Sequence, residues 1–403
     1  MAVDWTQLPP ELVERISKSV TILRDYVCLR AVCRPWRSSI PPNPNHLRLQ
    51  LPWLLLPQSD PNQSHRPFFD LSTNKFYSLY LPEISPTMRQ CGSSHGWLII
   101  VDDTPDIFII KPLTRAKINL PSFLTSPSVV SFNHADIDSQ YKLYLTLDHD
   151  YVYPHSSRET RDTYIKKIVL SSSPSTDNNF TAVAIVRIHL GRLAYYRNNK
   201  DRCWKLTDAV NYLDIVCHNG LFYVLYLQEK HGVAVFNMSK GDLTRVSLVI
   251  LERPTSMDFR LSIDIRLVCS GDDVLLVVQH MERDVEYFPD PREKSLWKSK
   301  VLWMEVFRFG WRRRRLERVR DLGDRALFVG QNNGFSLLAS DCAGCMKNCI
   351  YFTDYTNEGE QYRDLFGDYE VGIFRLCDKS IEYLPRCGRH LWPPPIWVTP
   401  NPC

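Results

Sequence analysis

The hydrophobic residues between positions 8 and 40 recur at spacings of three and four, which is typical of amphipathic helices. The first helical stripe consists of Leu12, Val13, Ile16 and Val20. Thr6 can cap the start of this helix, because a hydroxyl side chain there accepts a hydrogen bond from a free N–H group. Pro35 forces a break or a new start just after it. The pattern therefore predicts three short helices.

After Phe68 the period changes to two. Short alternating runs predict strands at residues 97–101, 107–111, 141–147 and 180–186. Pairs of such strands around a polar turn recur in segments 95–121, 218–246 and 349–385. Units of several antiparallel strands that repeat every ~40 to 55 residues are typical of propeller blades. We therefore expect an α+β multidomain chain, in which a small three-helix module precedes an all-β propeller of six or seven blades.

The segment between the two patterns, residues 43–67, is rich in proline and polar residues and is predicted to be a linker. This places the helical module in residues 1–42 and the β-propeller in residues 68–403. An apolar island from Leu51 to Leu56 interrupts the linker. We expect the island to pack on the large domain as a first strand or a strap, because burial of apolar side chains is favourable.

Charge and cysteine content restrict the partners and the compartment. The formal net charge of +4 over 403 residues creates no field that favours nucleic acid or an anionic membrane, so neither is expected as a partner. No apolar run has the length of a signal peptide or a membrane span. The 12 cysteines are scattered through a large chain without an export signal, which favours reduced thiols. We expect an intracellular protein of the nucleus and/or the cytoplasm.

A known family pattern lies within the helical region. The residues that carry it are Leu8-Pro9, Glu11-Leu12, Ile16, Asp25, Leu29, Val32-Cys33 and Trp36-Arg37. In this order and spacing they closely resemble the F-box. The resemblance implies a three-helix surface that binds a Skp1-type adaptor and, through it, a cullin. The apolar residues that it assigns to the adaptor contact are Leu8, Pro9, Leu12, Ile16, Val32 and Trp36. The alternative is that these residues only pack the module against the next domain.

The large region also carries a series of family blocks. In chain order they read SSHGWLII, KPLTRAKINLP, KIVLSSSPS, HNGLFYV, DLGDRALFVG, NCIYFTD and PPPIWVTP. They resemble the C-terminal domain that follows the F-box in a plant-expanded family, for which the KIB-type members imply a kelch-like β-propeller. The segment WRRRRLERVR departs from the milder strand that the family usually has at this place. This departure affects the expected role of a loop and leaves the expected fold unchanged.

A catalytic interpretation needs a site, and the sequence offers no recognisable motif for one. It has no nucleophile elbow, Walker loop, GxGxxG helix start or HExxH motif. His95 and His218 stand beside turn residues, so a turn or packing role is expected for both. We expect no catalytic residue, no cofactor and no bound metal.

One cysteine cluster deserves a separate hypothesis. Cys342, Cys345 and Cys349 form a C-x-x-C-x-x-x-C pattern, and the possible further zinc ligands downstream are Cys377, Cys387 and His390. Structural zinc sites usually combine two paired cysteine knuckles, whereas this segment contains one. We therefore favour a reduced surface loop in which the thiols act as small hydrophobic groups.

Three surface segments are candidates for binding. The basic run Arg312 to Arg315 could hold phosphate or direct nuclear import, but a solvated strand edge is the more common explanation. Polar inserts at 148–164 and 281–300 are long for a compact domain, and long loops are often functional. If these inserts lie on the binding face, the aromatic substrate anchors would be Tyr151, Tyr153, Tyr287, Phe288 and Trp297.

Two functions of different classes follow from these patterns. The first is a substrate-recognition subunit of an SCF-type (Skp1-cullin-F-box) ubiquitin ligase, which recruits an unknown protein substrate and performs no chemistry itself. The alternative is a ligand-binding or enzymatic propeller whose F-box serves adaptor binding or its own turnover. The alternative predicts a cluster of acids or a metal in the central channel.

Overall fold

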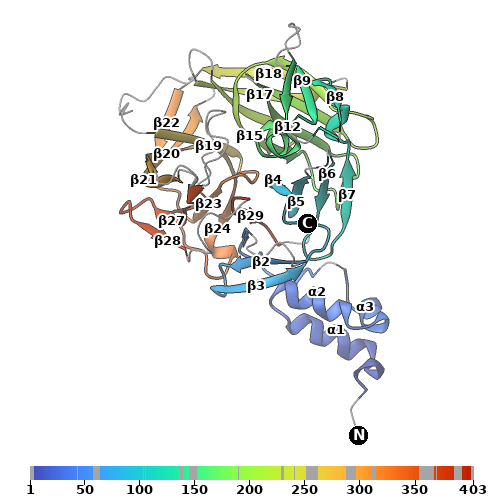
Figure 1. Ribbon diagram of the computed structural model, residues 1–403. Coiled ribbons are helices and arrows are strands. Elements are labelled where there is room, and N and C mark those ends of the chain that lie inside the picture. Colours follow the sequence, from blue (N-terminus) through green and yellow to red (C-terminus); the bar gives the residue numbers. More distant parts are fainter. Residues whose placement is uncertain are drawn as a thin grey trace.

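The computed structural model contains a small helical module and a larger body of β-sheets (Figure 1). It describes residues 4–42, 44–57, 64–102, 104, 106–133, 135–136, 139–144, 152–188, 190–227, 231–239, 241–250, 262–286, 296–310, 315–353, 367–368, 370–384 and 393–400. None of the helices within these ranges is both long and apolar enough to cross a membrane.

The helical module contains the three predicted helices, α1 (Pro10–Ser19), α2 (Leu23–Ala31) and α3 (Arg34–Ser39), after a short 3-10 turn, η1 (Trp5–Gln7). The predicted cap is wrong: Pro9 is the N-cap of α1, and Thr6 lies in η1, where its N–H donates to the side chain of Asp4. The module has a compact apolar core of Val13, Tyr26, Trp36 and Ile40.

Four of the sheets have four strands each. The first has the order β29-β1-β2-β3 and consists of β29 (Ile396–Val398), β1 (Trp53–Leu55), β2 (His65–Asp70) and β3 (Lys75–Tyr80). The second consists of β4 (Arg89–Ser94), β5 (Trp97–Val101), β6 (Ile107–Ile110) and β7 (Lys117–Leu120). The third consists of β11 (Ile165–Leu170), β12 (Thr181–Ile188), β13 (Leu190–Arg197) and β14 (Lys205–Ala209). The fourth consists of β15 (Tyr212–His218), β16 (Leu221–Leu227), β17 (His231–Ser239) and β18 (Asp242–Ile250).

The largest sheet has the order β22-β21-β20-β19-β24-β23-β25-β27-β28, and β26 (Gly367–Asp368) pairs with β21 beside this path. Its other strands are β19 (Ser262–Ser270), β20 (Asp273–Glu286), β21 (Leu296–Gly310), β22 (Arg315–Val319), β23 (Arg325–Val329), β24 (Phe335–Leu338), β25 (Cys349–Thr353), β27 (Val371–Arg375) and β28 (Ile381–Tyr383).

A smaller, three-stranded sheet is inserted between β7 and β11. It consists of β8 (Val129–Phe132), β9 (Tyr141–Tyr144) and β10 (Val152–His155). The short helical turns of the domain are η2 (Phe123–Thr125), α4 (Ser157–Glu159), η3 (Thr160–Tyr164) and η4 (Ala339–Asp341).

The sheets form a ring, as expected for a propeller (Figure 1). Strand contacts link the inner strands in the order β29, β4, β11, β15, β19 and β23. Neighbouring inner strands approach closely at Gly92, where a Cβ atom would lie 2.4 Å from the carbonyl oxygen of Ile168. Successive residues of an inner strand pack in opposite directions: Ile168 belongs to the same core cluster as Ile99, whereas Val169 belongs to that of Ile215. The inner strands β4 and β11 are accordingly buried on both faces along most of their length, whether their side chains are polar or apolar.

The boundary of the β domain differs from the sequence-based one. Residues 51–57, which were expected in the linker of 43–67, are all buried, and β1 pairs with both β2 and β29. The apolar island is therefore a strand of the first sheet, and the sheet domain begins before residue 68. Trp397 of β29 is fully buried and donates its indole N–H to the carbonyl oxygen of Val329 at 3.2 Å. Strands from the two ends of the domain thus close the ring.

A loop between β23 and β24 spans one end of the ring. The N–H of Asn333 donates to the carbonyl oxygen of Ser93 in β4, and its side-chain oxygen accepts from the N–H of Cys217 in β15. The next residue, Gly334, accepts a hydrogen bond from the N–H of Cys269 in β19. A Cβ atom at Gly334 would lie 2.2 Å from the carbonyl oxygen of Leu267, so glycine allows this close approach. The loop connects inner strands of different sheets.

Candidate functional site

The helical module presents apolar side chains to solvent. Leu12 and Ile16 lie one turn apart on α1 and are 46% and 38% exposed. Val32, the C-cap of α2, is 56% exposed, and Pro9 is exposed at the start of α1. These four members of the predicted adaptor set are therefore accessible to a partner. Exposed apolar side chains on a small module are typical of an interaction surface.

The other two predicted adaptor residues have a different environment. Trp36 is only 7% exposed, packs in the module core, and donates its indole N–H to the carbonyl oxygen of Trp5 at 3.1 Å. Leu8 is partly buried against the same core. Trp36 therefore packs between α1 and α2, against Val13 and Tyr26, and stabilises the module. Sequence reasoning missed Trp5, which is 60% exposed; an aromatic residue just before the LPPEL segment was the available signal.

The module is attached to the ring by ordered contacts. The helices lie below the ring of sheets in Figure 1. The guanidinium of Arg24 in α2 stacks over the aromatic ring of Tyr77 in β3 at 4.4 Å. Tyr26 donates its hydroxyl hydrogen to the carbonyl oxygen of Pro41 at 2.8 Å, and Gln50 donates to that of Thr21 at 3.2 Å. The segment between α3 and β1 is therefore packed against the helices. This packing restricts the orientation of the helical module relative to the ring of sheets.

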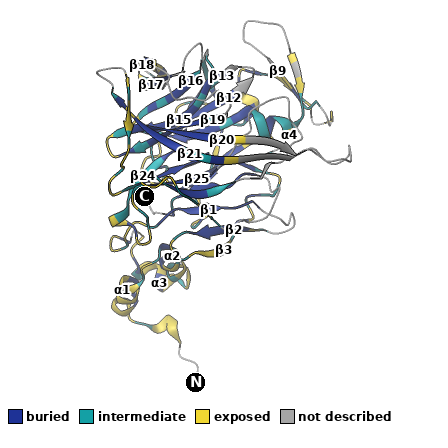
Figure 2. Ribbon diagram, turned by 90° about the vertical axis from the view of Figure 1, so that its left-hand side faces the viewer, coloured by how far each residue is buried: buried dark blue, intermediate teal, exposed yellow. Residues whose placement is uncertain are grey.

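The proposed substrate anchors lie mostly outside the described part of the chain. Tyr151, Tyr287 and Phe288 are outside the described residues. Tyr153 lies in β10 and Trp297 in β21, and only their backbone is described. Figure 2 shows β9 and α4 on the same side of the ring. The binding role of these aromatic residues stays a prediction.

A buried set of charges lies on the inner strands. Lys167 in β11 and Asp214 in β15 form an ion pair of 2.6 Å, and both side chains are almost fully buried. The second oxygen of Asp214 accepts the N–H of Leu267 at 2.8 Å. On β19, Arg266 donates to Asp264 at 2.7 Å. Burial lowers the pKa of Lys167, and the carboxylate of Asp214 opposes this shift only in part. Sequence reasoning missed this set, because its members come from distant segments.

The central charges bear on the enzymatic alternative, which predicts acids in the channel. Both acids described above, Asp214 and Asp264, are engaged by a neighbouring cation. An acid that is paired in this way has fewer free lone pairs for a substrate or a metal. The arrangement therefore stabilises the packing of inner strands against one another.

The cysteine cluster has the character of buried thiols. Burial raises the pKa of Cys342 to about 11, that of Cys345 to about 12 and that of Cys349 to about 11. Zinc binds thiolates, so metal binding here would require deprotonation of these buried thiols. Across the described residues, no three His, Cys, Asp or Glu side chains gather as metal ligands. Cys387 and His390 lie outside those residues.

The turn histidines and Arg315, the described residue of the basic run, occupy surface positions. His95 and Gly96 connect β4 to β5 with φ of 52° and 77°. Asn219 and Gly220, which follow His218, connect β15 to β16 with φ of 49° and 75°. Such pairs of positive φ values are typical of two-residue hairpins. Arg315 begins the edge strand β22 and is exposed, whereas residues 311–314 lie outside the described part.

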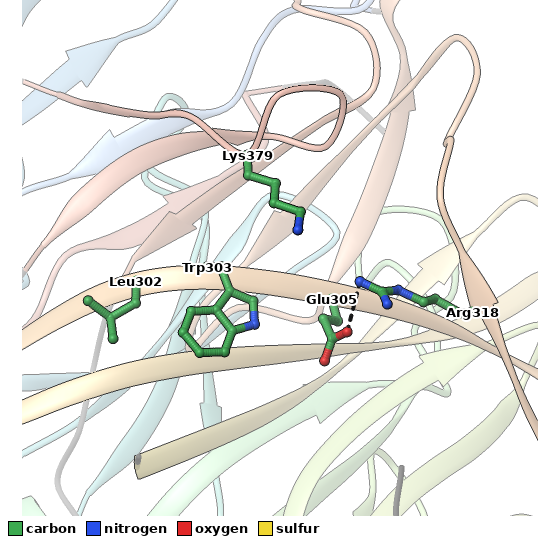
Figure 3. A pocket seen from close by; sticks show the side chains of 5 residues that line it. All are labelled: Leu302, Trp303, Glu305, Arg318 and Lys379. Carbon is green, nitrogen blue, oxygen red and sulfur yellow. Dashed lines mark ion pairs between the residues drawn. The ribbon is translucent and has the colours of Figure 1, made fainter. Parts of the chain in front are cut away.

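A pocket of about 370 Å³ lies beside β21 (Figure 3). Its lining residues are Leu302, Trp303, Glu305, Arg318 and Lys379. The volume is at the lower end of the range of ligand sites. This pocket was not anticipated from the sequence, because its walls come from β21, β22 and the turn between β27 and β28.

The ring of sheets with a helical module at one edge defines a β-propeller protein with an attached helical module. The chain belongs to the KIB1-4 beta-propeller family, whose model matches residues 68–375. It is 26% identical to the F-box protein SKIP23 of Arabidopsis thaliana, over 98% of this chain and 96% of that protein. It is also 26% identical to the putative F-box protein At5g60060 of the same plant, over 92% and 93% of the two chains.

These relatives confirm the resemblance to plant F-box proteins that carry a KIB-type propeller. Among solved structures, the β-propeller domain of Cps50 (Swd1) from Myceliophteria thermophila matches with a TM-score of 0.34 and 7% identity, over 81% of each chain. A similarity this distant carries no functional information.

Proposed function

We propose that this protein is the substrate-recognition subunit of an SCF-type ubiquitin ligase. Its helical module would bind a Skp1-type adaptor and, through it, a cullin, while the propeller binds a protein substrate. The subunit acts by bringing the substrate close to the ubiquitin-charged enzyme, so it needs no catalytic residue or cofactor of its own. The proposal places the protein inside the cell, in the nucleus and/or the cytoplasm.

The observation that carries the proposal is the exposed pair Leu12 and Ile16 on α1. Their side chains would bury apolar area only in a complex, and full burial of one such side chain contributes about 1.5–3 kcal/mol. The relatives named F-box proteins support the same interpretation, since they align over nearly the whole chain.

The contacts at the junction support a role in positioning. Arg24 and Tyr77 connect α2 to β3, and the connecting segment packs on the helices. A restricted orientation would hold the substrate at a fixed place relative to the adaptor, which raises its effective concentration at the ligase.

A pull-down of the purified chain with a Skp1-type adaptor tests the proposal. The double variant Leu12→Asp/Ile16→Asp should lose saturable binding, because two charges would be desolvated at the contact. Val246→Asp is the control, since Val246 is also an exposed apolar residue, at 56%, but lies on β18 of the ring. The control should bind like the wild type.

Absence of adaptor binding by the wild type would reject the proposal. Equal binding by the double variant would show that Leu12 and Ile16 are not the contact. Trp36→Ala is less informative, because Trp36 is buried and its loss would unfold the module.

The proposal also includes the number of blades. We infer six, because each of the four four-stranded sheets counts as one blade and the largest sheet divides into two, one of β19–β22 and one of β23–β25, β27 and β28. On this assignment the largest sheet contains two blades, joined where β19 pairs with β24 through a single residue pair.

A further inference from the structure

The pocket beside β21 is lined by residues that strand pairing brings to one face. Trp303 and Glu305 are two positions apart on β21, so their side chains point to the same side of the strand. Phe307 is two positions further along the same face of β21. Arg318 on β22 lies opposite Phe307, so its side chain is on that face as well. Lys379, from the turn after β27, reaches toward the pocket from another part of the sheet (Figure 3).

A buried hydrogen-bonded pair holds the wall of this pocket. One carboxylate oxygen of Glu305 lies 3.0 Å from Nε2 of His280, and the other lies 2.9 Å from the guanidinium of Arg318. The imidazole of His280 is stacked on the indole of Trp303, with centroids 4.4 Å apart and planes 16° from parallel. His280 and Glu305 are buried, whereas the side chain of Arg318 is 49% exposed. The buried residues therefore fix the orientation of an exposed guanidinium.

The groups that remain available in the pocket are hydrogen-bond donors. Both oxygens of Glu305 already have partners. Arg318 has five N–H donors and uses part of them for Glu305. Within the described ranges, the ammonium of Lys379 takes part in no ion pair. The two cations outnumber the single carboxylate, so the pocket favours a ligand that carries an anionic acceptor.

Trp303 adds an apolar requirement to this charge preference. Its indole forms a flat wall that is held in place by the stack with His280. Flat aromatic walls contact apolar side chains well and lose little conformational entropy on binding. The volume of about 370 Å³ suits one side chain and part of its neighbour.

We propose that this pocket binds an acidic side chain of the protein substrate, with its carboxylate between Arg318 and Lys379 and an adjacent apolar residue against Trp303. The inference rests on the proposed function, because it assigns the substrate class of a recognition subunit. Arg318 and Lys379 are the binding residues, and Glu305 and His280 are positioning residues that act through Arg318.

Two pools of short fluorescein-labelled peptides test the inference by fluorescence anisotropy with the purified full chain. The first pool carries one Asp or Glu beside Phe or Leu in a Gly/Ser background, and the second carries Asn or Gln at the same position. The acidic pool should bind about tenfold more tightly, as expected for one charge-assisted hydrogen bond. Its affinity should fall as the salt concentration rises.

Four substitutions and one control locate the binding. Arg318→Gln and Lys379→Gln should each weaken binding of the acidic pool about tenfold. Glu305→Gln should weaken it less, and Trp303→Phe should retain most of the affinity because the aromatic wall remains. Arg308→Gln is the matched control. Arg308 is an exposed arginine on β21, the strand that carries Trp303 and Glu305, and it forms an ion pair with Asp273 instead. It should bind like the wild type.

Equal binding of the two pools, no binding of either pool, or unchanged binding by both Arg318→Gln and Lys379→Gln would overturn the inference. The same preparations are tested for thermal unfolding and for adaptor pull-down. Pocket variants that keep the adaptor and lose the acidic peptides support the inference. A wild-type chain that binds acidic peptides but no adaptor would reject the proposed ligase role and leave the peptide site established.

Discussion

Individual residues inside the ring show why part of this structure is hidden from sequence analysis. Lys167 and Asp214 are 47 positions apart and belong to different sheets, yet their side chains meet at 2.6 Å. In the run IKKIVL, a lysine such as Lys167 is expected to be solvated, because lysine is rarely buried without a partner and the sequence alone shows none. Only the closed ring makes it a buried partner.

Loss of the lysine alone should be strongly destabilising. Lys167→Met leaves Asp214 as an uncompensated buried charge, which costs about 3–5 kcal/mol of unfolding free energy. The double variant Lys167→Met/Asp214→Leu should recover most of that loss, since apolar groups can replace a buried pair. Urea unfolding followed by fluorescence measures both variants.

An exposed pair provides the control for this experiment. Lys18 and Glu14 form an ion pair of 2.7 Å on α1, where both side chains are largely in solvent. Lys18→Met should change the unfolding free energy by less than about 0.5 kcal/mol. If Lys167→Met were as mild as Lys18→Met, the buried pair would not exist in solution.

Asp201 gives a stability contribution that depends on pH. Hydrogen bonds from Arg197 lower its pKa to about 2, and Lys205 contributes to the same shift. A carboxylate with a lowered pKa stabilises the fold above its unfolded pKa of about 3.9 and loses this contribution as the pH falls toward 2. Asp201→Asn should therefore lower the free energy of unfolding by about 2 kcal/mol at pH 7 and at pH 5, and by less at pH 3.

Unfolding in urea at the three pH values checks this dependence. The exposed residue Asp25 on α2 supplies a control, because Asp25→Asn removes a charge from solvent. A loss that is the same at pH 3 as at pH 7 would contradict the assigned role of Asp201.

At the level of elements, the periodic segments were predictable and the irregular ones were not. Runs such as WLIIV and FTAVAIV are apolar over nearly a full strand length and became β5 and part of β12. β1 has three residues between prolines, and one of its partners, β29, lies more than 300 positions away, so local pattern could not fix its role. Trp36 shows the same limit, since its position in the motif does not reveal which side it faces.

Strand β29 closes the ring, and Trp397 anchors it in the core. Trp397 is buried among Phe328 and Tyr351, with ring centroids 5.7 and 6.3 Å away. Trp397→Ala should lower the unfolding free energy by about 3–5 kcal/mol, because it removes this packing and a buried hydrogen bond. Trp397→Phe should cost less, since it keeps an aromatic ring.

Thermal unfolding and limited proteolysis of the Trp397 variants test the closing contact. Trp397→Ala should expose new cleavage sites in the ring at temperatures where the wild type resists. Wild-type behaviour of this variant would show that β29 does not hold the ring closed.

The whole molecule combines a small helical unit with a large ring, and the sequence predicted this division. The class of the large domain was accessible because repeated strand pairs have a recognisable spacing. The pocket and the buried Lys167–Asp214 pair were inaccessible, since the pocket collects side chains from distant strands of one sheet and the pair joins two sheets. Sites on a ring of repeated units are combinations of positions that no single segment contains.

The pairing of β29 with β1 has a consequence for how the chain is made. The three helices contact one another within a span of about 40 residues, so they can fold as soon as they leave the ribosome. The ring can close only after residues 396–398 have been synthesised. Under the proposed function, a message cut short before that point would yield a chain that still occupies the adaptor but carries an open recognition domain. Such a product would compete with the full protein rather than merely be absent.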